Sequence, residues 1–200
     1  MIKIDKIEEL CKGKFVSLKK LYYTQDNKKK TWEIASIFDS VAVLIYNVTQ
    51  GSFVLVKQFR PPVYLKNNDG YTYELCAGIC DKDIPLEQIA IEEIYEETGY
   101  KVDSVIKINS FWTAVGSAGA KQTLFYAEVE DKDRINQGGG IDNEKIEVIH
   151  LPLNDMEDFM ENDDLVKTPG LLYAFEWWKN QAIEAMVEQT LEGNNNEINF

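Results

Sequence analysis

Histidine, cysteine and basic residues are scarce in this 200-residue sequence, which has one histidine and three cysteines. The cysteines, Cys11, Cys76 and Cys80, form no C-x-x-C pair, so we expect free thiols in a reducing cytoplasm. The 21 lysines and arginines are outnumbered by 34 aspartates and glutamates, giving a net charge of −13. This shortage of positive charge argues against nucleic acid and anionic membrane surfaces as partners.

Long apolar segments are also absent from the sequence. No run approaches the length of a membrane span, and the charged residues 1–6 do not resemble a signal peptide. The composition is nevertheless 44% apolar, which excludes a disordered chain. A chain of this length can bury a full core. We therefore expect one globular, cytoplasmic domain.

Residues 87–100 predict a short helix that is crowded with carboxylates. Glu93 and Glu97 are four residues apart and Glu96 is three from Glu93, so all three share one face of an α-helix. Like charges at this spacing destabilise an isolated helix by roughly 0.2–0.5 kcal/mol per pair. A solvated acidic face is one interpretation of this pattern, and a divalent cation site is the other. Oxygen ligands without histidine or thiolate suit Mg²⁺, with Mn²⁺ as the alternative.

Two features of the surrounding sequence favour the cation site. The apolar residues Ile89, Ala90, Ile91 and Ile94 supply a surface that anchors the helix to a core. Gly78 precedes the helix, and Gly99 stands at its C-terminal cap, where positive φ is favoured.

The 23-residue segment from Gly78 to Tyr100 resembles the Nudix box, which reads Gly-x5-Glu-x7-Arg-Glu-apolar-x-Glu-Glu-x-Gly-apolar. Other segments resemble the eukaryotic UDP-sugar diphosphatases, sister enzymes of the ADP-ribose diphosphatases, between about residues 12 and 180. They are Trp32-Glu33, Asp39-Ser-Val-Ala-Val-Leu44, Leu55-Val-Lys-Gln-Phe-Arg-Pro-Pro62, Glu74-Leu-Cys-Ala-Gly78 and Ile146-Glu-Val-Ile-His-Leu-Pro152. Two box positions depart, since Ile84 replaces the Glu and Glu92 replaces the Arg. In relatives both positions belong to the scaffold that orients the helix, and Glu87 is a candidate substitute for the missing acid.

The order of predicted elements gives an α/β fold, an α/β/α sandwich around a mixed sheet with a small N-terminal antiparallel β region. Helices are expected from about residue 85, over 154–161 and from 168 onward. We divide the chain into an N-terminal β region at 1–38, a Nudix hydrolase domain at 39–192 and a flexible tail at 193–200. Strands are expected over residues 15–23, 31–37, 40–48, 52–59, 71–76, 102–110, 122–129 and 145–151.

The resemblance also implies a metal site. Glu93 and Glu97 are the principal expected ligands, with Glu96 in the same cluster and the backbone carbonyl of Ala77 delivered by the turn at Gly78. The implied general base or additional ligand is Glu144, with Asp142 as second choice. Both lie in the Gly-rich segment 138–144, which is either a loop that closes over substrate or a solvated hairpin turn.

The implied substrate contacts are Arg60, Trp32, Phe15 and Gly78. Arg60 ends an apolar strand, where it either clamps a phosphate or forms a structural salt bridge. Trp32 and Phe15 occupy positions where relatives sandwich the nucleobase, one aromatic from each subunit of a swapped dimer, and core packing is the alternative. The resemblance and the N-terminal strands together predict a homodimer.

The predicted activity is metal-dependent hydrolysis of a UDP-sugar, such as UDP-glucose, to UMP and a sugar 1-phosphate. The segment Trp112-Thr-Ala-Val-Gly-Ser117 lacks the proline of ADP-ribose enzymes and matches the UDP-sugar group. ADP-ribose cleavage to AMP and ribose 5-phosphate is the alternative. A nucleotide-sugar binding module with decayed catalysis is the third hypothesis, favoured by Ile84 and Glu92.

Overall fold

A computed structural model describes residues 1–141 and 144–197, with side chains through Glu184. Its main sheet has the strand order β10-β5-β4-β9-β8, with β6 paired to β5 and β7 paired to β4. Among the strand pairs of the described residues, β4–β9 is the one parallel pair, so the sheet is mixed, as predicted. The strands are β4 (Ser40–Asn47), β5 (Ser52–Phe59), β6 (Tyr71–Glu74), β7 (Cys76–Ile79), β8 (Ile106–Thr113), β9 (Ala120–Val129) and β10 (Ile146–Pro152).

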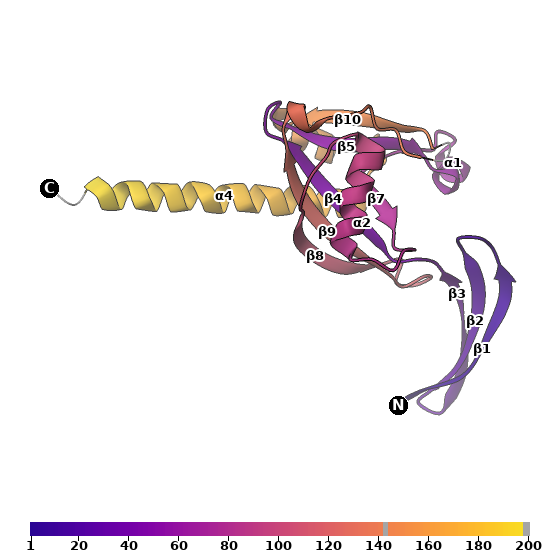
Figure 1. Cartoon of the computed structure of the whole chain (residues 1–200). Helices are drawn as coiled ribbons and strands as arrows, with labels where there is room; N and C mark the ends of the chain where they lie inside the picture. Colours follow the sequence, from indigo (N-terminus) through magenta and orange to yellow (C-terminus); the bar gives the residue numbers. More distant parts are fainter. Residues whose placement is uncertain (142–143, 198–200) are drawn as a thin grey trace.

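Strand β4 reads as a continuous apolar run because both faces of the sheet are covered. Its alternate residues face opposite ways, with Val41 and Val43 in one core cluster and Ala42 and Leu44 in the other. The helix α2 (Leu86–Glu93) covers the first face (Figure 1). The second face is covered by α3 (Met156–Glu161) and the first part of α4 (Pro169–Glu197). This arrangement confirms the α/β/α sandwich.

The long helix α4 packs through a stripe of apolar side chains. Leu171, Ala174 and Phe175 are buried in the core, and Trp178 packs against it. The sequence predicted core packing for a stripe made of Leu172, Phe175, Trp178, Ala182, Ala185 and Met186. Phe175 and Trp178 confirm it, whereas the side chains of Ala185 and Met186 lie outside the described part of the chain. A frayed tail was expected from Gly193, but the helix continues to Glu197. Residues 198–200 lie outside the described part of the chain.

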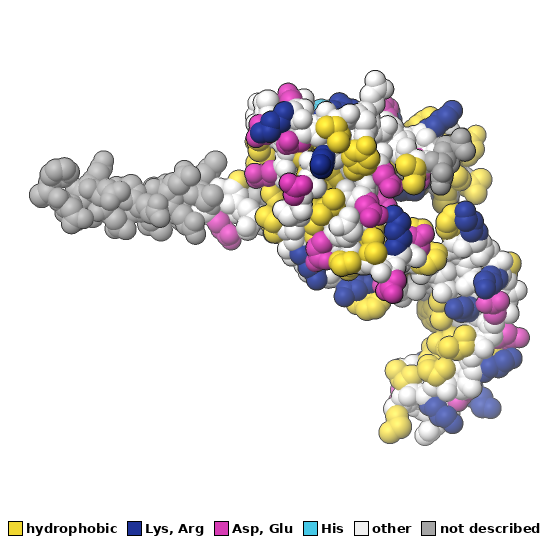
Figure 2. Space-filling view, viewed as in Figure 1, with side chains coloured by type: hydrophobic (Ala, Val, Ile, Leu, Met, Phe, Trp, Pro, Cys, Tyr) yellow, Lys and Arg dark blue, Asp and Glu magenta, His cyan; other side chains and the backbone are white. Residues whose placement is uncertain are grey.

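A separate three-stranded antiparallel sheet projects from this body (Figure 1). It comprises β1 (Ile2–Lys12), β2 (Ser17–Gln25) and β3 (Lys28–Ser36). The sequence did not predict β1. Between β2 and β3, Asp26 and Asn27 both have positive φ, as a type I′ two-residue hairpin requires. Apolar side chains and lysines lie side by side on the exposed surface of this sheet (Figure 2).

One helix, which follows Arg60, was not predicted from the sequence, where only the end of an apolar strand was expected. Helix α1 (Pro61–Asn67) has proline in its first turn and ends at Asn68, which adopts the left-handed conformation. The short helix carries no buried residue, so no apolar periodicity marked it in the sequence. No helix in the described residues is long and apolar enough to cross a membrane.

Candidate active site

A cleft of about 470 Å³ opens where the N-terminal sheet, the main sheet and the box helix meet. Its lining includes the aromatic side chains of Phe15 and Phe38. Uncharged polar side chains from the main sheet also line it, namely Ser40, Gln58, Thr113 and Gln122. Its charged lining residues are Arg60, Glu74, Glu93, Glu97 and Glu144. The cleft therefore combines an apolar surface for a flat ring with a cluster of acidic oxygens.

The box helix changes geometry at the site. It is α-helical through Glu93 and continues as a π-helical turn from Ile94 to Thr98. The turn ends at Gly99, which has φ of 78°. Turns of this kind contain more residues per turn than an α-helix, and they are frequent at functional sites. The predicted cap at Gly99 is thus confirmed, whereas a regular helix over the acidic segment is not.

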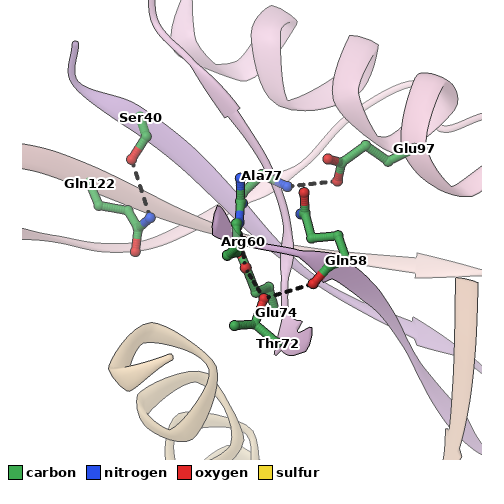
Figure 3. A network of polar contacts seen from close by, with 8 residues as sticks. All are labelled: Ser40, Gln58, Arg60, Thr72, Glu74, Ala77, Glu97 and Gln122. Carbon is green, nitrogen blue, oxygen red and sulfur yellow. Dashed lines mark hydrogen bonds and ion pairs between the residues drawn. The ribbon is translucent and has the colours of Figure 1, made fainter. Parts of the chain in front are cut away.

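Glu97 is the most buried of the box carboxylates, with 5% of its surface exposed. Its Oε2 accepts a hydrogen bond from the backbone N–H of Ala77 at 3.0 Å (Figure 3). Burial raises the pKa of Glu97 to about 8, and the charges of Glu93 and Glu144 add to this effect. A carboxylate in such a place is costly when ionised, unless a cation accompanies it.

Glu93 lies against the backbone of Gly78. A Cβ at position 78 would fall 2.0 Å from Oε1 of Glu93, so only glycine allows this approach. Burial raises the pKa of Glu93 to about 7, with a further increase from the charge of Glu96. Glycine is therefore needed at position 78 because β7 packs closely against the carboxylate of Glu93, and not because the backbone has a positive φ there.

Glu96 lies away from the cleft. It lines a separate groove on the outer side of the box helix, with Ile91, Tyr95 and Lys101. The π-helical turn explains this position, because residues three apart no longer share a face when the turn is widened. Glu96 still acts on the site through its charge on Glu93, and its predicted role as a direct ligand stays a prediction.

Glu144 lies on the cleft wall, and its Oε2 accepts a hydrogen bond from the N–H of Ile141 at 3.1 Å. The preceding glycines are docked on the end of the box helix. Gly139 N–H donates to the carbonyl of Glu97 at 2.8 Å, and Gly140 N–H donates to that of Glu96 at 3.0 Å. These hydrogen bonds cap the helix. The capping explains why glycines stand here, and this explanation needs no loop that closes over substrate. Asp142, the second predicted base, lies outside the described residues.

Arg60 reaches the cleft but is engaged by Glu74. Its Nε and Nη2 each donate to one oxygen of Glu74 at 2.7 Å, and Thr72 donates to Oε1 as well (Figure 3). The hydrogen bonds that Arg60 donates to Glu74 raise the pKa of Arg60, and the charges of Glu97 and Glu144 act in the same direction. The structural salt bridge weighed from the sequence is therefore present. Because a guanidinium has five N–H groups, this bond leaves others for a phosphate.

The two predicted aromatic contacts are placed differently. Phe15 lines the cleft. Trp32 stands outside it on β3, and its indole Nε1–H donates to the carbonyl of Gly116 at 2.8 Å. The N–H of Ala35 also donates to Ser117 at 2.8 Å. Trp32 therefore helps to fix the projecting sheet to the 114–119 loop within one chain.

Some cleft residues were not predicted from the sequence. Phe38, Ser40, Gln58 and Gln122 come from three separate strands or their ends, and Gln122 Nε2 donates to Ser40 Oγ at 3.2 Å (Figure 3). Their contact depends on the parallel pairing of β4 with β9, which sets Ser40 opposite Gln122. A single sequence carries no signal for that register.

The acidic side chains that line the cleft fit a divalent metal ion of the magnesium type. No three His, Cys, Asp or Glu side chains among the described residues form a closed metal cluster. Glu93 and Glu97 nevertheless converge from one helix, and their raised pKa values mark an unbalanced negative charge. Mg²⁺ commonly uses one or two carboxylates and completes its shell with water and substrate phosphates. An open pair of carboxylates is therefore sufficient.

Comparisons with known proteins agree with this geometry. Residues 37–169 match the family model described as the NUDIX domain. The chain is 37% identical over 194 residues to the uridine diphosphate glucose pyrophosphatase NUDT14 of Mus musculus, covering 82% of this chain and 87% of that protein. It is 36% identical over 160 residues to the GDP-mannose pyrophosphatase of Cronobacter sakazakii, covering 74% and 82%. The crystal structure of an ADP compounds hydrolase shares the fold, with a TM-score of 0.70 at 17% identity, and the match covers 90% of this chain and 95% of that one.

Proposed function

The chain belongs to the Nudix family, and from this premise we propose that it cleaves UDP-glucose to UMP and glucose 1-phosphate with a divalent metal ion. The family and the named relatives identify a hydrolase that acts on nucleoside diphosphate sugars. The uridine nucleotide is proposed because the two UDP-glucose pyrophosphatases match over more of the chain than the GDP-mannose pyrophosphatases do.

The observation that carries the proposal is one cleft lined both by the carboxylates of Glu93, Glu97 and Glu144 and by the aromatic side chains of Phe15 and Phe38. Nudix hydrolases generally use divalent metals. Such an ion would be held by Glu93, Glu97 and the carbonyl of Ala77, where it neutralises phosphate oxygens and lowers the pKa of a water molecule.

The protein's own groups then have distinct tasks. Glu144 accepts the proton of the water that attacks phosphorus, and the phosphoanhydride bond breaks to release the sugar phosphate. Arg60, held by Glu74, directs its remaining N–H groups to a phosphate oxygen. Phe15 and Phe38 stack against the base, a contact that tolerates different bases.

Product analysis tests this proposal directly. UDP-glucose, GDP-mannose and ADP-ribose are each incubated with the protein and Mg²⁺, and in parallel with excess EDTA. We expect UMP and glucose 1-phosphate to form fastest and only with the metal. Equal or greater efficiency on ADP-ribose or GDP-mannose overturns the choice of nucleotide while leaving the reaction class intact.

A binding module without catalysis is the competing proposal, and Ile84 and Glu92 are the residues that favour it. Isothermal titration with UDP-glucose, set beside the hydrolysis assay, separates the two. If the wild-type protein binds UDP-glucose but no Mg²⁺-dependent or Mn²⁺-dependent product forms, the binding module is correct.

We also propose that the protein is a homodimer formed through the N-terminal sheet. The side chains of Ile2, Ile4 and Ile7 on β1 are exposed in the single chain, and a sheet of this size needs a covered apolar face to be stable. Sedimentation of the purified protein measures its mass in solution. A monomer at micromolar concentration contradicts this proposal. The cytoplasmic location stays a prediction.

A further inference from the structure

An ion pair joins the loop at residues 79–85 to the box helix. Lys82 Nζ lies 2.6 Å from Oε2 of Glu92, and Gln88 Nε2 donates to the other oxygen of Glu92 at 3.4 Å. Both carboxylate oxygens of Glu92 are thus engaged, one by the loop and one by its own helix. The contact ties the loop to the last α-helical turn, next to the start of the π-helical turn.

This ion pair is adjacent to one of the proposed metal ligands. Glu92 directly precedes Glu93, and the backbone of Gly78, four residues before Lys82, lies against the carboxyl group of Glu93. The segment 78–82 therefore holds the helix at two consecutive residues, by close packing at Glu93 and by an ion pair at Glu92. The positive charge of Lys82 also lowers the pKa of Glu93, opposing Glu96 and Glu144.

The pair occupies the region where the sequence departs from the Nudix box. The box places an acid at position 84 and a base at position 92, whereas this chain places a base in the loop and an acid on the helix. Glu87, the substitute considered from the sequence, is exposed in the first turn and makes no hydrogen bond or ion pair within the described residues. The charges of loop and helix are exchanged, and their attraction is kept.

We propose that Lys82 and Glu92 form a reversed ion pair that positions Glu93 for metal binding. The inference rests on the proposed metal-dependent function, and both are positioning residues because neither lines the cleft. Lys82 is half-exposed and Glu92 one-third exposed, so solvent screens their attraction. Pairs of this kind change an equilibrium by about two- to fivefold, and we expect metal affinity to change by that factor.

Mn²⁺ binding in the absence of substrate, followed by electron paramagnetic resonance, distinguishes positioning from simple charge. Lys82→Glu makes the neighbourhood more negative, so charge alone would tighten Mn²⁺ binding, whereas lost positioning weakens it. Glu92→Arg weakens binding for either reason. We expect each single variant to lose about two- to fivefold. The double variant Lys82→Glu/Glu92→Arg, which has the polarity of the box, should return to within about twofold of wild type.

Two further variants complete the design. Lys82→Arg keeps the pair and should bind Mn²⁺ like wild type. Lys82→Met keeps the aliphatic stem without the charge, and it should bind more weakly by about twofold. Thermal unfolding in EDTA shows whether the charge-reversed proteins fold. If they do not, Lys82→Met alone provides the test.

The outcomes separate the inference from the proposed function. Tighter Mn²⁺ binding by Lys82→Glu or Lys82→Met overturns the positioning pair. It is also overturned if the change in Mn²⁺-binding free energy of the double variant equals the sum of the changes in the two single variants. A wild-type protein that binds no Mn²⁺ and hydrolyses nothing contradicts the metal-dependent function itself. Weaker binding by both single variants with recovery in the double variant supports the pair.

Discussion

Glu97→Gln is expected to stabilise the metal-free protein while abolishing hydrolysis. Glu97 is almost fully buried, and burial raises its pKa from 4.5 to about 8. A glutamine fills the same volume and keeps an oxygen to accept the hydrogen bond from Ala77. It removes the carboxylate that a metal ion would need as a ligand. In the metal-free protein, this carboxylate is costly because it is buried without a cation. Stability and activity should therefore change in opposite directions.

The size of the effect follows from proton linkage. Because the folded pKa of Glu97 lies above the unfolded value, its contribution to stability is fully present below about pH 4.5 and is lost as pH rises through 8. At about 1.4 kcal/mol per pH unit, the loss between pH 6 and pH 8 is on the order of 3 kcal/mol. For a domain of this length, that corresponds to about 6–12 °C in Tm.

Thermal unfolding in EDTA at pH 6 and pH 9 measures this difference. The Tm of wild type should fall across this range relative to Glu97→Gln, and Mg²⁺ should restore it at pH 9 only in wild type. Glu87→Gln, on the exposed first turn of the same helix, is the matched control and should behave like wild type. If Glu97→Gln is the less stable protein at pH 9 in EDTA, the explanation based on a costly buried carboxylate is wrong.

Three more substitutions test other parts of the site. Gly78→Ala places a methyl group on the carboxyl of Glu93, so it should cost about 1–3 kcal/mol in denaturant unfolding and lower kcat. Glu74→Gln removes the charge that holds Arg60. We expect the free energy of unfolding to fall by about 1–3 kcal/mol and the KM for UDP-glucose to rise. An unchanged KM would argue against substrate binding by Arg60. Ile7→Glu, on exposed β1, should shift sedimentation from dimer to monomer, and no shift would place the interface elsewhere.

The fold was largely predictable because its signals are local. The β4–β5 hairpin was marked by two β-branched runs around Gly51, and it pairs in that register. The box helix was marked by proline before it and glycine after it. Strand β1 was missed because it carries a charge at nearly every second position and buries almost nothing within one chain. A half-covered edge element gives no clear apolar alternation.

The site was predictable where ligands share a helix and unpredictable where they meet across the sheet. Glu93 and Glu97 followed from spacing, because four residues keep them on one side even in the widened turn. The position of Glu96 was not predicted from the spacing, since it lies in a π-helical turn and lines another groove, and its role as a ligand stays a prediction. Gln122 and Ser40 meet only through the pairing of β4 with β9, which depends on long-range topology rather than on local sequence.

The two departures from the Nudix box affect the scaffold and not the oxygens that face the cleft. An ion pair between the loop and the helix can orient the helix. The attraction is the same whichever of the two partners carries the positive charge. A ligand is different, because only an anionic oxygen at the position of Glu97 can balance a divalent cation in a buried place. If Lys82 and Glu92 position Glu93 as proposed, the replacement of the box Arg by Glu92 is compatible with catalysis, because Lys82 supplies the opposite charge. Removal of the Lys82 charge should therefore weaken metal binding only by about twofold, whereas loss of the Glu97 carboxylate should abolish hydrolysis.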